Sequence, residues 1–504
     1  MAVKIILLIL FFGVMMGIGV YARKHATDVN GFVLGGRSVG PWLTAFAYGT
    51  SYFSAVVFVG YAGQFGYKYG LASTWIGIGN AVLGSLVAWV VLGRRTRIMS
   101  KHLGSMTMPD FFGKRYDSQS LRIAASVIAF IFLIPYTASV YNGLSYLFGM
   151  AFDVDFRICV VVMAVLTGVY VIIGGYMATA WNDLIQGIIM LFGIVAVIAA
   201  VLSGHGGFMA AVKELAQVPS SVMPGAYASF LGPDPANLFG VVILTSLGTW
   251  GLPQMIQKFY AIKDEKAVHT GTIISTLFAI VVSGGCYFLG GFSRIFGVKE
   301  AVDGTVKYDT IIPTMLSSLP DILIGIVIVL VLSASMSTLS SLVLTSSSTL
   351  TLDFIKPLFV KKMNEKQQLV WMRVLLAGFI LISVVIALDP PAFIAQLMGI
   401  SWGALAGAFL APFLYGLYWK GVTRAAVWAS FICGVGITVA NMFFRFIASP
   451  INAGAFAMVA GLVIVPVVSL ISPKLKKETV EDVFHCLEEK VMVEQKLALP
   501  EEEE

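Results

Sequence analysis

The sequence has few charged residues for its length. Only 12% of its 504 residues are Asp, Glu, Lys or Arg, whereas 58% are hydrophobic, a balance outside the usual range of soluble globular proteins. Histidine is also scarce, with five residues, and the four cysteines are scattered at Cys159, Cys286, Cys433 and Cys486. These counts argue against a disulfide framework, a Cys/His metal centre and an enzyme with clustered titratable groups. We therefore expect no enzymatic activity and no cofactor.

Long apolar runs make up most of the sequence. Runs of about 20 residues, the length that crosses ~30 Å of hydrocarbon, recur along nearly the whole chain. This pattern predicts an all-α membrane protein with about 13 transmembrane helices. The expected spans lie near residues 3–21, 41–66, 73–93, 122–150, 157–177, 182–203, 238–256, 272–293, 311–350, 368–388, 393–418, 424–444 and 451–472. The span at 311–350 is too long for one crossing, so we expect it to be bent or to follow a short loop helix.

The basic residues are distributed unevenly over the predicted loops. If the N-terminus is outside, 25 of the 33 Lys and Arg fall on the inner side and 8 on the outer side. Because inner loops carry the excess of positive charge, this predicts an outer N-terminus and a cytoplasmic C-terminus in a plasma or bacterial inner membrane. The net charge of +6 thus reports orientation in a lipid bilayer. It does not indicate a nucleic-acid partner, and no obligate protein partner is evident.

Two stretches of five predicted spans can be laid against each other, residues 41–203 and 238–418. Each opens with a span interrupted by small or polar residues, the first at 47–51 and the second at 246–251, with Pro253 close behind. Paired interrupted helices in corresponding positions indicate a transporter site, because unwinding frees backbone carbonyls near the middle of the membrane. Five is an odd number, so the second stretch would be inverted relative to the first.

This pattern divides the chain into six parts. They are a leading helix and loop (1–40), a first inverted repeat (41–203), an outer loop (204–237), a second inverted repeat (238–418), two trailing helices (419–472) and a charged cytoplasmic tail (473–504). The tail ends in Glu501 to Glu504, and its composition is typical of a solvated appendage.

A run of hydroxyl side chains without charge lies deep in the apolar sequence, between residues 331 and 350. Its serines are spaced so that they share one helical face: Ser333, Ser337, Ser340, Ser341 and Ser348. Neutral oxygens at this density suit a sodium ion, whereas calcium or magnesium would recruit several carboxylates. Helix packing through Ser and Thr is an equally good interpretation of the run alone.

Asp183 is a carboxylate beside a long apolar stretch. An ionisable group at membrane depth costs ~2.5 to 3.5 kcal/mol, so it usually faces a partner or a transport pathway. Asp183 is also the evident candidate for proton coupling, and capping of a helix at the interface is the alternative. Three aromatic residues, Tyr136, Trp250 and Trp402, lie in or near spans and either line a cavity or pack between helices.

Four stretches resemble the sodium/solute symporter family, which includes bacterial proline, pantothenate and sialic acid transporters and animal glucose and monocarboxylate transporters. They lie in order from about residue 30 to 430: residues 32–38, residues 174–176 with 181–183, residues 335–340, and residues 416–420 with 423–424. The resemblance implies a leucine-transporter-like fold, with a five-plus-five inverted repeat, one extra helix before it and two after it.

The resemblance also implies a sodium site between the interrupted second span and the ninth span. The implied ligands are the backbone oxygens of Thr50, Phe53 and Ala334 and the hydroxyls of Ser337 and Thr338. Some relatives use a second sodium ion, and the matching positions are Asp183, Ser337, Ser340 and Ser341. Sodium is the one metal expected, as a coupling ion.

The substrate is less closely defined by the resemblance. Proline-carrying relatives have an acidic residue at the position of Tyr52, whereas residues 251–254 with 263–264 and 267–269 look closer to pantothenate and monocarboxylate transporters. We expect a small carboxylate-bearing solute, although sugars stay open. Its expected contacts are Tyr52, Phe53, Tyr136, Thr249 and Trp250.

These observations predict a sodium-coupled secondary active symporter that imports a small organic solute, such as a monocarboxylate, a pantothenate-like compound or an amino acid, by alternating access. A proton-coupled symporter of the same fold differs only in its ion. A transporter-like membrane sensor is a further alternative, but such proteins usually append a signalling domain, and the charged tail is short.

Overall fold

The computed structural model describes residues 2–152, 154–297, 306–317, 319–389 and 393–498, and this part of the chain is helical without a strand. The α-helices are α1 (Ala2–Ala22), α2 (Val29–Leu34), α3 (Pro41–Tyr52), α4 (Ala62–Tyr69), α5 (Thr74–Gly79), α6 (Arg94–His102), α7 (Met108–Arg115), α8 (Gln119–Phe152), α9 (Phe156–Ser203), α10 (Phe208–Ala216), α11 (Pro235–Leu247), α12 (Pro253–Ala261), α13 (Glu265–Gly290), α14 (Ile311–Leu316), α15 (Asp321–Thr349), α16 (Lys356–Leu358), α17 (Glu365–Leu388), α18 (Ile394–Tyr418), α19 (Arg424–Phe444), α20 (Pro450–Ile471) and α21 (Lys477–Ala498). Tighter or wider helical turns join several of them: η3 (Val56–Tyr61), η5 (Asn80–Val87), η6 (Trp89–Gly93), η8 (Gly248–Trp250), η10 (Tyr308–Thr310) and η11 (Leu350–Ile355).

The expected all-helical membrane fold is confirmed. Within the described residues, ten helices are long and apolar enough to cross a membrane, or up to eleven if the bent pair of α11 and α12 is one span. The sequence predicted a turn between the second and third spans and another between the fifth and sixth. In the structure, Val56–His102 and Phe156–Ser203 each continue as one helical stretch across these positions. The backbone takes a positive φ at Gly70 and Gly175 within these stretches, a conformation that favours glycine.

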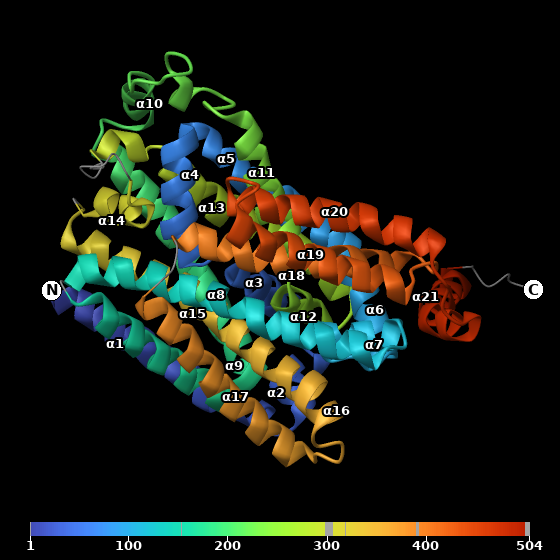
Figure 1. Cartoon of the computed structure of the whole chain (residues 1–504). Coiled ribbons are helices and arrows are strands. Elements are labelled where there is room, and N and C mark those ends of the chain that lie inside the picture. Colours follow the sequence, from blue (N-terminus) through green and yellow to red (C-terminus); the bar gives the residue numbers. More distant parts are fainter. Residues whose placement is uncertain (1, 153, 298–305, 318, 390–392, 499–504) are drawn as a thin grey trace, which may run out of the picture.

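The over-long predicted span at 311–350 is resolved into two helices. The short helix α14 precedes the long helix α15, as expected for a loop helix before a crossing. The windows of α15 and α18 are the most buried of the candidate spans, at 78% and 89%, whereas only 22% of the α1 window is buried. Helices α15 and α18 therefore form the centre of the bundle, and α1 lies at its periphery (Figure 1).

One predicted helix interruption is present, whereas the other, expected at residues 47–51, is wrong in its position. Helix α11 ends at Leu247, passes through η8 and resumes as α12 with a bend of 42°. The first interruption lies later than expected, because α3 continues through residues 47–51 to Tyr52 and breaks at Phe53 and Ser54. Gly49 does not break the helix. A Cβ there would lie 2.4 Å from the Phe278 ring, so this glycine lets α13 pack closely on α3.

Helix ends are fixed by residues that stop or start helices locally. Asp264 accepts a hydrogen bond from the Ala267 N–H and caps α13, while Pro41 and Pro253 occupy the first turns of α3 and α12. Such residues satisfy or remove N–H groups that have no partner within the helix. The breaks around the centre of the bundle are thus encoded locally.

The two ends of the bundle differ in character (Figure 1). One end carries α10 and α14, and the other carries α6, α7, α16 and the C-terminal helix α21. Helix α21 packs on this second end, where Phe484 is buried and the Arg115 guanidinium lies 4.9 Å from its ring. The first part of the charged tail is therefore docked on the bundle, whereas Glu501 to Glu504 lie outside the described residues.

Candidate functional site

The break in α3 exposes backbone carbonyls in the middle of the bundle. Phe53 adopts an extended conformation, and Ser54 starts the next helical segment by accepting a hydrogen bond from the Val56 N–H at 3.1 Å. Because the last carbonyls of a helix have no partner within it, the oxygens of Thr50 and Ser51 need partners from elsewhere. The Gly49 oxygen already accepts from the Phe53 N–H.

Two hydroxyl groups of α15 supply these partners. The Ser337 Oγ lies 3.1 Å from the Thr50 oxygen and 2.9 Å from the Ser333 oxygen of its own helix. The Thr338 Oγ1 lies 3.2 Å from the Thr50 oxygen and 3.5 Å from the Ser51 oxygen. Both hydroxyls also lie 3.1 Å from the Ala334 oxygen of their own helix. The result is a buried cluster of oxygens that contains no charged group.

The structure brings together four of the five positions that the sequence analysis named for the first sodium ion. Thr50, Ala334, Ser337 and Thr338 converge at the break, and all four are buried. Phe53 lies directly at the break, with its ring stacked on Tyr52 at 4.2 Å. The structure thus explains the hydroxyl run in part, because these two hydroxyls face another helix instead of lipid.

The positions named for a second sodium ion have an unexpected neighbour. The Lys258 Nζ lies 3.0 Å from the Ser341 Oγ and 3.8 Å from the Asp183 Oδ2. Asp183 is fully buried within α9, so it does not cap a helix at an interface as the alternative interpretation held. The Ser340 hydroxyl bonds to the Ser337 oxygen of its own helix.

Sequence reasoning missed Lys258, because it counted this residue among the basic residues of an inner loop. The expected span ended at residue 256, yet α12 continues to Ala261, and the side chain of Lys258 is only 2% exposed. A signal was available: Pro253 opens an apolar helical segment, and a lysine one turn inside such a segment lies at membrane depth and needs a partner.

Three of the residues expected to contact a substrate form one aromatic cluster. Tyr52 and Tyr136 each lie 5.8 Å from Trp402, measured between ring centroids, and Phe53 stacks on Tyr52. The Tyr52 hydroxyl donates to the Thr245 oxygen of α11. Trp402 fits closely against the η8 turn, because a Cβ at Gly248 would lie 2.4 Å from its ring. The cluster therefore joins both interrupted helices.

The other two expected contacts lie on the same turn but bond to a different helix. The Thr249 Oγ1 donates to the Gly84 oxygen at 3.1 Å, and the Trp250 Nε1 donates to the Leu83 oxygen at 2.9 Å. The Tyr48 hydroxyl donates to the same Gly84 oxygen at 2.7 Å. Thr249 and Trp250 thus fasten η8 to η5.

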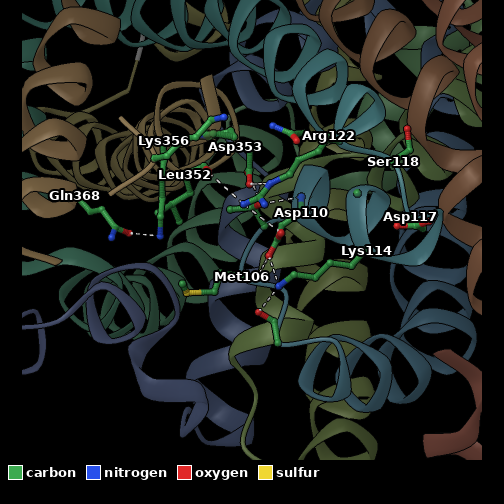
Figure 2. Close-up of a pocket in the computed structure, with 16 residues that line it drawn as sticks. Met106, Asp110, Lys114, Asp117, Ser118, Arg122, Leu352, Asp353, Lys356 and Gln368 are labelled. Carbon is green, nitrogen blue, oxygen red and sulfur yellow. Dashed lines mark hydrogen bonds and ion pairs between the residues drawn. The ribbon is translucent and has the colours of Figure 1, made fainter. Parts of the chain in front are cut away.

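An ion-pair network lies at the end of the bundle that carries α7 and α16 (Figure 2). Arg122 lies 3.2 Å from an Asp110 oxygen and 2.8 Å from an Asp353 oxygen, and Lys114 lies 3.0 Å from Asp110. These groups line a pocket of about 680 Å³, where Lys356 also donates to Gln368. Sequence analysis did not foresee this network, because Asp353 lies 231 residues from Arg122 in the chain.

A second pocket, of about 610 Å³, lies at the opposite end of the bundle. Lys68, Asp234 and Arg294 are the charged residues in its lining. Close to this end, the Asp309 Oδ2 accepts a hydrogen bond from the Ile394 N–H at 3.2 Å, at the start of α18. Asp309 lies outside the candidate spans, and burial raises the pKa of its carboxyl group to about 6.

The turn at residues 35–37, which precedes α3, contacts α12. Gly35 and Gly36 both take positive φ values and turn the chain, so that the guanidinium of Arg37 reaches the Tyr260 oxygen at 3.4 Å and the Ser100 Oγ at 3.3 Å. Burial lowers the pKa of Arg37 to about 10. The contact of Arg37 with the Tyr260 oxygen helps to hold α12, and with it Lys258, in place.

Comparison with known proteins gives a consistent result. A model of the sodium:solute symporter family matches residues 32–434. The chain is 28% identical over 483 residues to the osmoregulated proline transporter OpuE of Bacillus subtilis (strain 168), covering 95% of this chain and 96% of that protein. It is also 28% identical over 486 residues to the sodium/proline symporter of Staphylococcus aureus (strain JH9), covering 94% and 93%.

Two solved structures share the fold. A Na⁺-coupled sialic acid symporter in a substrate-bound, outward-open state is similar with a TM-score of 0.76 at 16% identity, over 94% of this chain and 99% of that one. A nucleobase-cation-symport-1 family transporter, closed with bromovinylhydantoin bound, is similar with a TM-score of 0.55 at 12% identity, over 90% and 97%. At these identities the likeness concerns the helical arrangement.

Proposed function

The chain belongs to the sodium:solute symporter family, and we propose that it imports a small carboxylate-bearing solute together with sodium by alternating access. The proposed sodium ligands are the oxygens of Thr50, Phe53 and Ala334 and the hydroxyls of Ser337 and Thr338. The observation that carries this proposal is the contact of two α15 hydroxyls with a carbonyl left open by the break in α3. Such a site replaces the water shell of a monovalent cation without fixed charge.

The proposed architecture is the five-plus-five inverted repeat at residues 41–203 and 238–418. Dividing the two long helical stretches at Gly70 and Gly175 and counting the bent pair as one span gives the thirteen spans of the sequence analysis. The two interrupted helices would then open the two repeats, in corresponding positions. The excess of basic residues at the end that carries α6, α7 and α16 supports a cytoplasmic location of that end in the cell membrane.

A carboxylate-bearing substrate is supported by two features. The curated relatives are named for proline and a solved relative for sialic acid, and both compounds carry a carboxylate. The pocket at the end opposite the basic one is lined by two cations, Lys68 and Arg294, against one acid, Asp234. This pocket would attract an anionic group before the solute reaches Tyr52, Phe53, Tyr136, Thr249 and Trp250.

Sodium would favour the outward-open arrangement and thereby raise the affinity for the solute by reciprocal linkage. The packing of Phe53, at the break in α3, on Tyr52 of the aromatic cluster supports this linkage. An ion that orders the end of α3 also orders the neighbouring ring. The sodium gradient and the membrane potential, worth ~2.3 kcal/mol per charge per 100 mV, would then drive accumulation.

Uptake into proteoliposomes that contain the purified chain tests the proposal. We expect an inward sodium gradient to drive uptake of at least one compound from a panel of radiolabelled amino acids, including proline, and monocarboxylates. Choline in place of sodium should abolish it. Uptake that runs on a pH gradient without sodium would reject sodium coupling and favour the proton-coupled alternative, to which the buried carboxylate of Asp183 is relevant.

A further inference from the structure

Lys258 is a positive charge built into the centre of the bundle. Its side chain is 2% exposed, and the Asp183 side chain opposite is fully buried. Within the described residues, Asp183 is the acidic group that lies within ion-pair distance of Lys258. On the remaining side the ammonium group lies 5.1 Å from the ring centroid of Tyr176. A buried carboxylate needs a nearby positive charge, and Lys258 provides it.

The oxygens around this ammonium group are those that would otherwise suit a sodium ion. The Ser341 Oγ lies 3.0 Å from the Nζ, the Asp183 Oδ2 lies 3.8 Å from it, and the Ser51 Oγ lies 2.7 Å from the Ser341 Oγ. One carboxylate and two hydroxyls form a donor set for a hard monovalent cation. The ammonium group occupies the point at which such an ion would contact both Asp183 and Ser341.

Ser51 joins this group to the proposed sodium site. Its backbone oxygen lies 3.5 Å from the Thr338 Oγ1, whereas its side chain contacts Ser341. A change in the position of Lys258 therefore reaches the end of α3 through two hydroxyl groups. Both interrupted helices take part, because Lys258 belongs to α12 and Ser51 belongs to α3.

We propose that Lys258 is a tethered cation that takes the place of a second coupling ion, so that this chain carries one sodium ion per solute. The inference rests on the proposed function and deepens it. The ammonium group stabilises the same carboxylate and hydroxyls as a mobile ion would, but it remains in the protein when the solute is released. Lys258 is thus a positioning residue that determines the ion stoichiometry.

Binding of radioactive sodium alone to the purified full chain tests this, with choline chloride keeping the ionic strength constant. We expect about one ion per chain for the wild type and about two for Lys258→Met, because Met keeps the length of the stem and leaves Asp183 open to sodium. Lys258→Arg retains the charge and should bind about one. The double variant Lys258→Met/Asp183→Asn should also return to about one, since it removes the carboxylate.

The outcomes separate this inference from the function on which it rests. Two ions bound by the wild type, or one by a folded Lys258→Met variant, would overturn the tethered cation and leave sodium coupling intact. No bound sodium in the wild type would overturn the proposed sodium site itself. If Lys258→Met does not fold without sodium, its melting temperature in high sodium decides: rescue by sodium but not by choline supports the inference, and equal failure in both salts contradicts it.

Discussion

The hydroxyl groups of Ser51 and Ser341 lie 2.7 Å apart, although the two residues belong to α3 and α15. This contact connects two buried groups of different character. On one side lie neutral oxygens around the broken end of α3, and on the other side lies the Asp183–Lys258 ion pair. The first group depends on the break at Phe53, because an unbroken helix would use the carbonyls of Thr50 and Ser51 in its own hydrogen bonds.

Removing the hydroxyls at the break should weaken sodium binding. Ser337→Ala and Thr338→Val each remove one oxygen ligand from the proposed site, and Thr338→Val retains the shape of the side chain. We expect each to raise the sodium concentration for half-maximal uptake about tenfold, as for the loss of ~1.4 kcal/mol. Sodium titration of uptake in proteoliposomes measures this.

Matched controls lie on the same stretch of chain. Ser348 and Thr351 are buried, and their hydroxyls donate to carbonyls of their own helical segment, such as Leu344 for Ser348 and Ser347 for Thr351. Ser348→Ala and Thr351→Val should leave the sodium dependence unchanged. If all four variants shift it equally, the hydroxyls serve helix packing and the assigned site is wrong.

Arg122 should be essential to the stability of the end of the bundle shown in Figure 2. It pairs with both Asp110 and Asp353, whose side chains are 7% and 0% exposed. Arg122→Gln leaves the buried carboxylate of Asp353 without its cationic partner and Asp110 with Lys114 alone, and removing one partner of a buried ion pair costs about 3–5 kcal/mol. We expect a clear fall in the thermal unfolding temperature of the detergent-solubilised protein.

Lys114→Gln provides the comparison for Arg122→Gln. Lys114 also pairs with Asp110, but its side chain is 38% exposed, and pairs of this kind contribute about 0–1 kcal/mol. We expect little change in the unfolding temperature. A loss as large as that of Arg122→Gln would show that net positive charge, and not the buried bridge, holds this end together.

Asp309 should make stability depend on pH. Burial raises the pKa of its carboxyl group from 3.8 to about 6, so between these values the folded state binds more protons than the unfolded state. The stabilisation is therefore present below about pH 4 and is lost as pH rises through 6, by on the order of 2 to 3 kcal/mol. Asp309→Asn keeps an acceptor for the Ile394 N–H and removes this titration.

The measurement for Asp309 is the difference in unfolding temperature between Asp309→Asn and the wild type across pH 4.5 to 8. Because other carboxyl groups titrate in both proteins, only this difference reports on Asp309. We expect the variant to gain relative to the wild type as pH rises to about 6.5 and then to level off. A difference that is constant over the whole range would show that Asp309 titrates normally.

The sequence predicted the helical membrane fold because hydrocarbon leaves the backbone no other partners than its own. The interruption between α11 and α12 was also predictable, since small residues and Pro253 lie there in an apolar context. The exact break in α3 was not, because whether Gly49 breaks a helix or admits a neighbour depends on Phe278, a residue of another helix. Composition cannot show that contact.

The candidate site shows the same division. Hydroxyls at helical spacing indicated a polar face on α15, and the family resemblance named Ser337 and Thr338, which the structure places against α3. The role of Lys258 was not predicted, because the expected span ended before this residue on average hydropathy. Its partner Asp183 also lies on a different helix, α9. Pairings between helices depend on tertiary packing, so they became visible only in three dimensions.

Helices α4 and α13 pack so closely that we expect no side chain to be tolerated at Gly66. A Cβ there would lie 2.0 Å from the Gly290 oxygen, and a Cβ at Gly290 would lie 2.1 Å from the Ala62 oxygen. The obstacle is backbone on both sides, so it cannot move aside by a change of rotamer. Gly66→Ala therefore forces the helices apart, at a cost of at least 1–3 kcal/mol. We expect a lower unfolding temperature and reduced uptake, because α4 continues the interrupted helix from the proposed sodium site.

Gly284→Ala in α13 is the comparison for Gly66→Ala in α4, because it adds the same methyl group to a helix at a position with free space. A Cβ at Gly284 has nothing within 4 Å, and Ala is favoured over Gly inside a helix by about 0.5–1 kcal/mol. We expect this variant to match or exceed the wild type in unfolding temperature. Should Gly66→Ala behave in the same way, α4 and α13 must be able to separate without loss, and the close contact would not hold α4 in place beside the break.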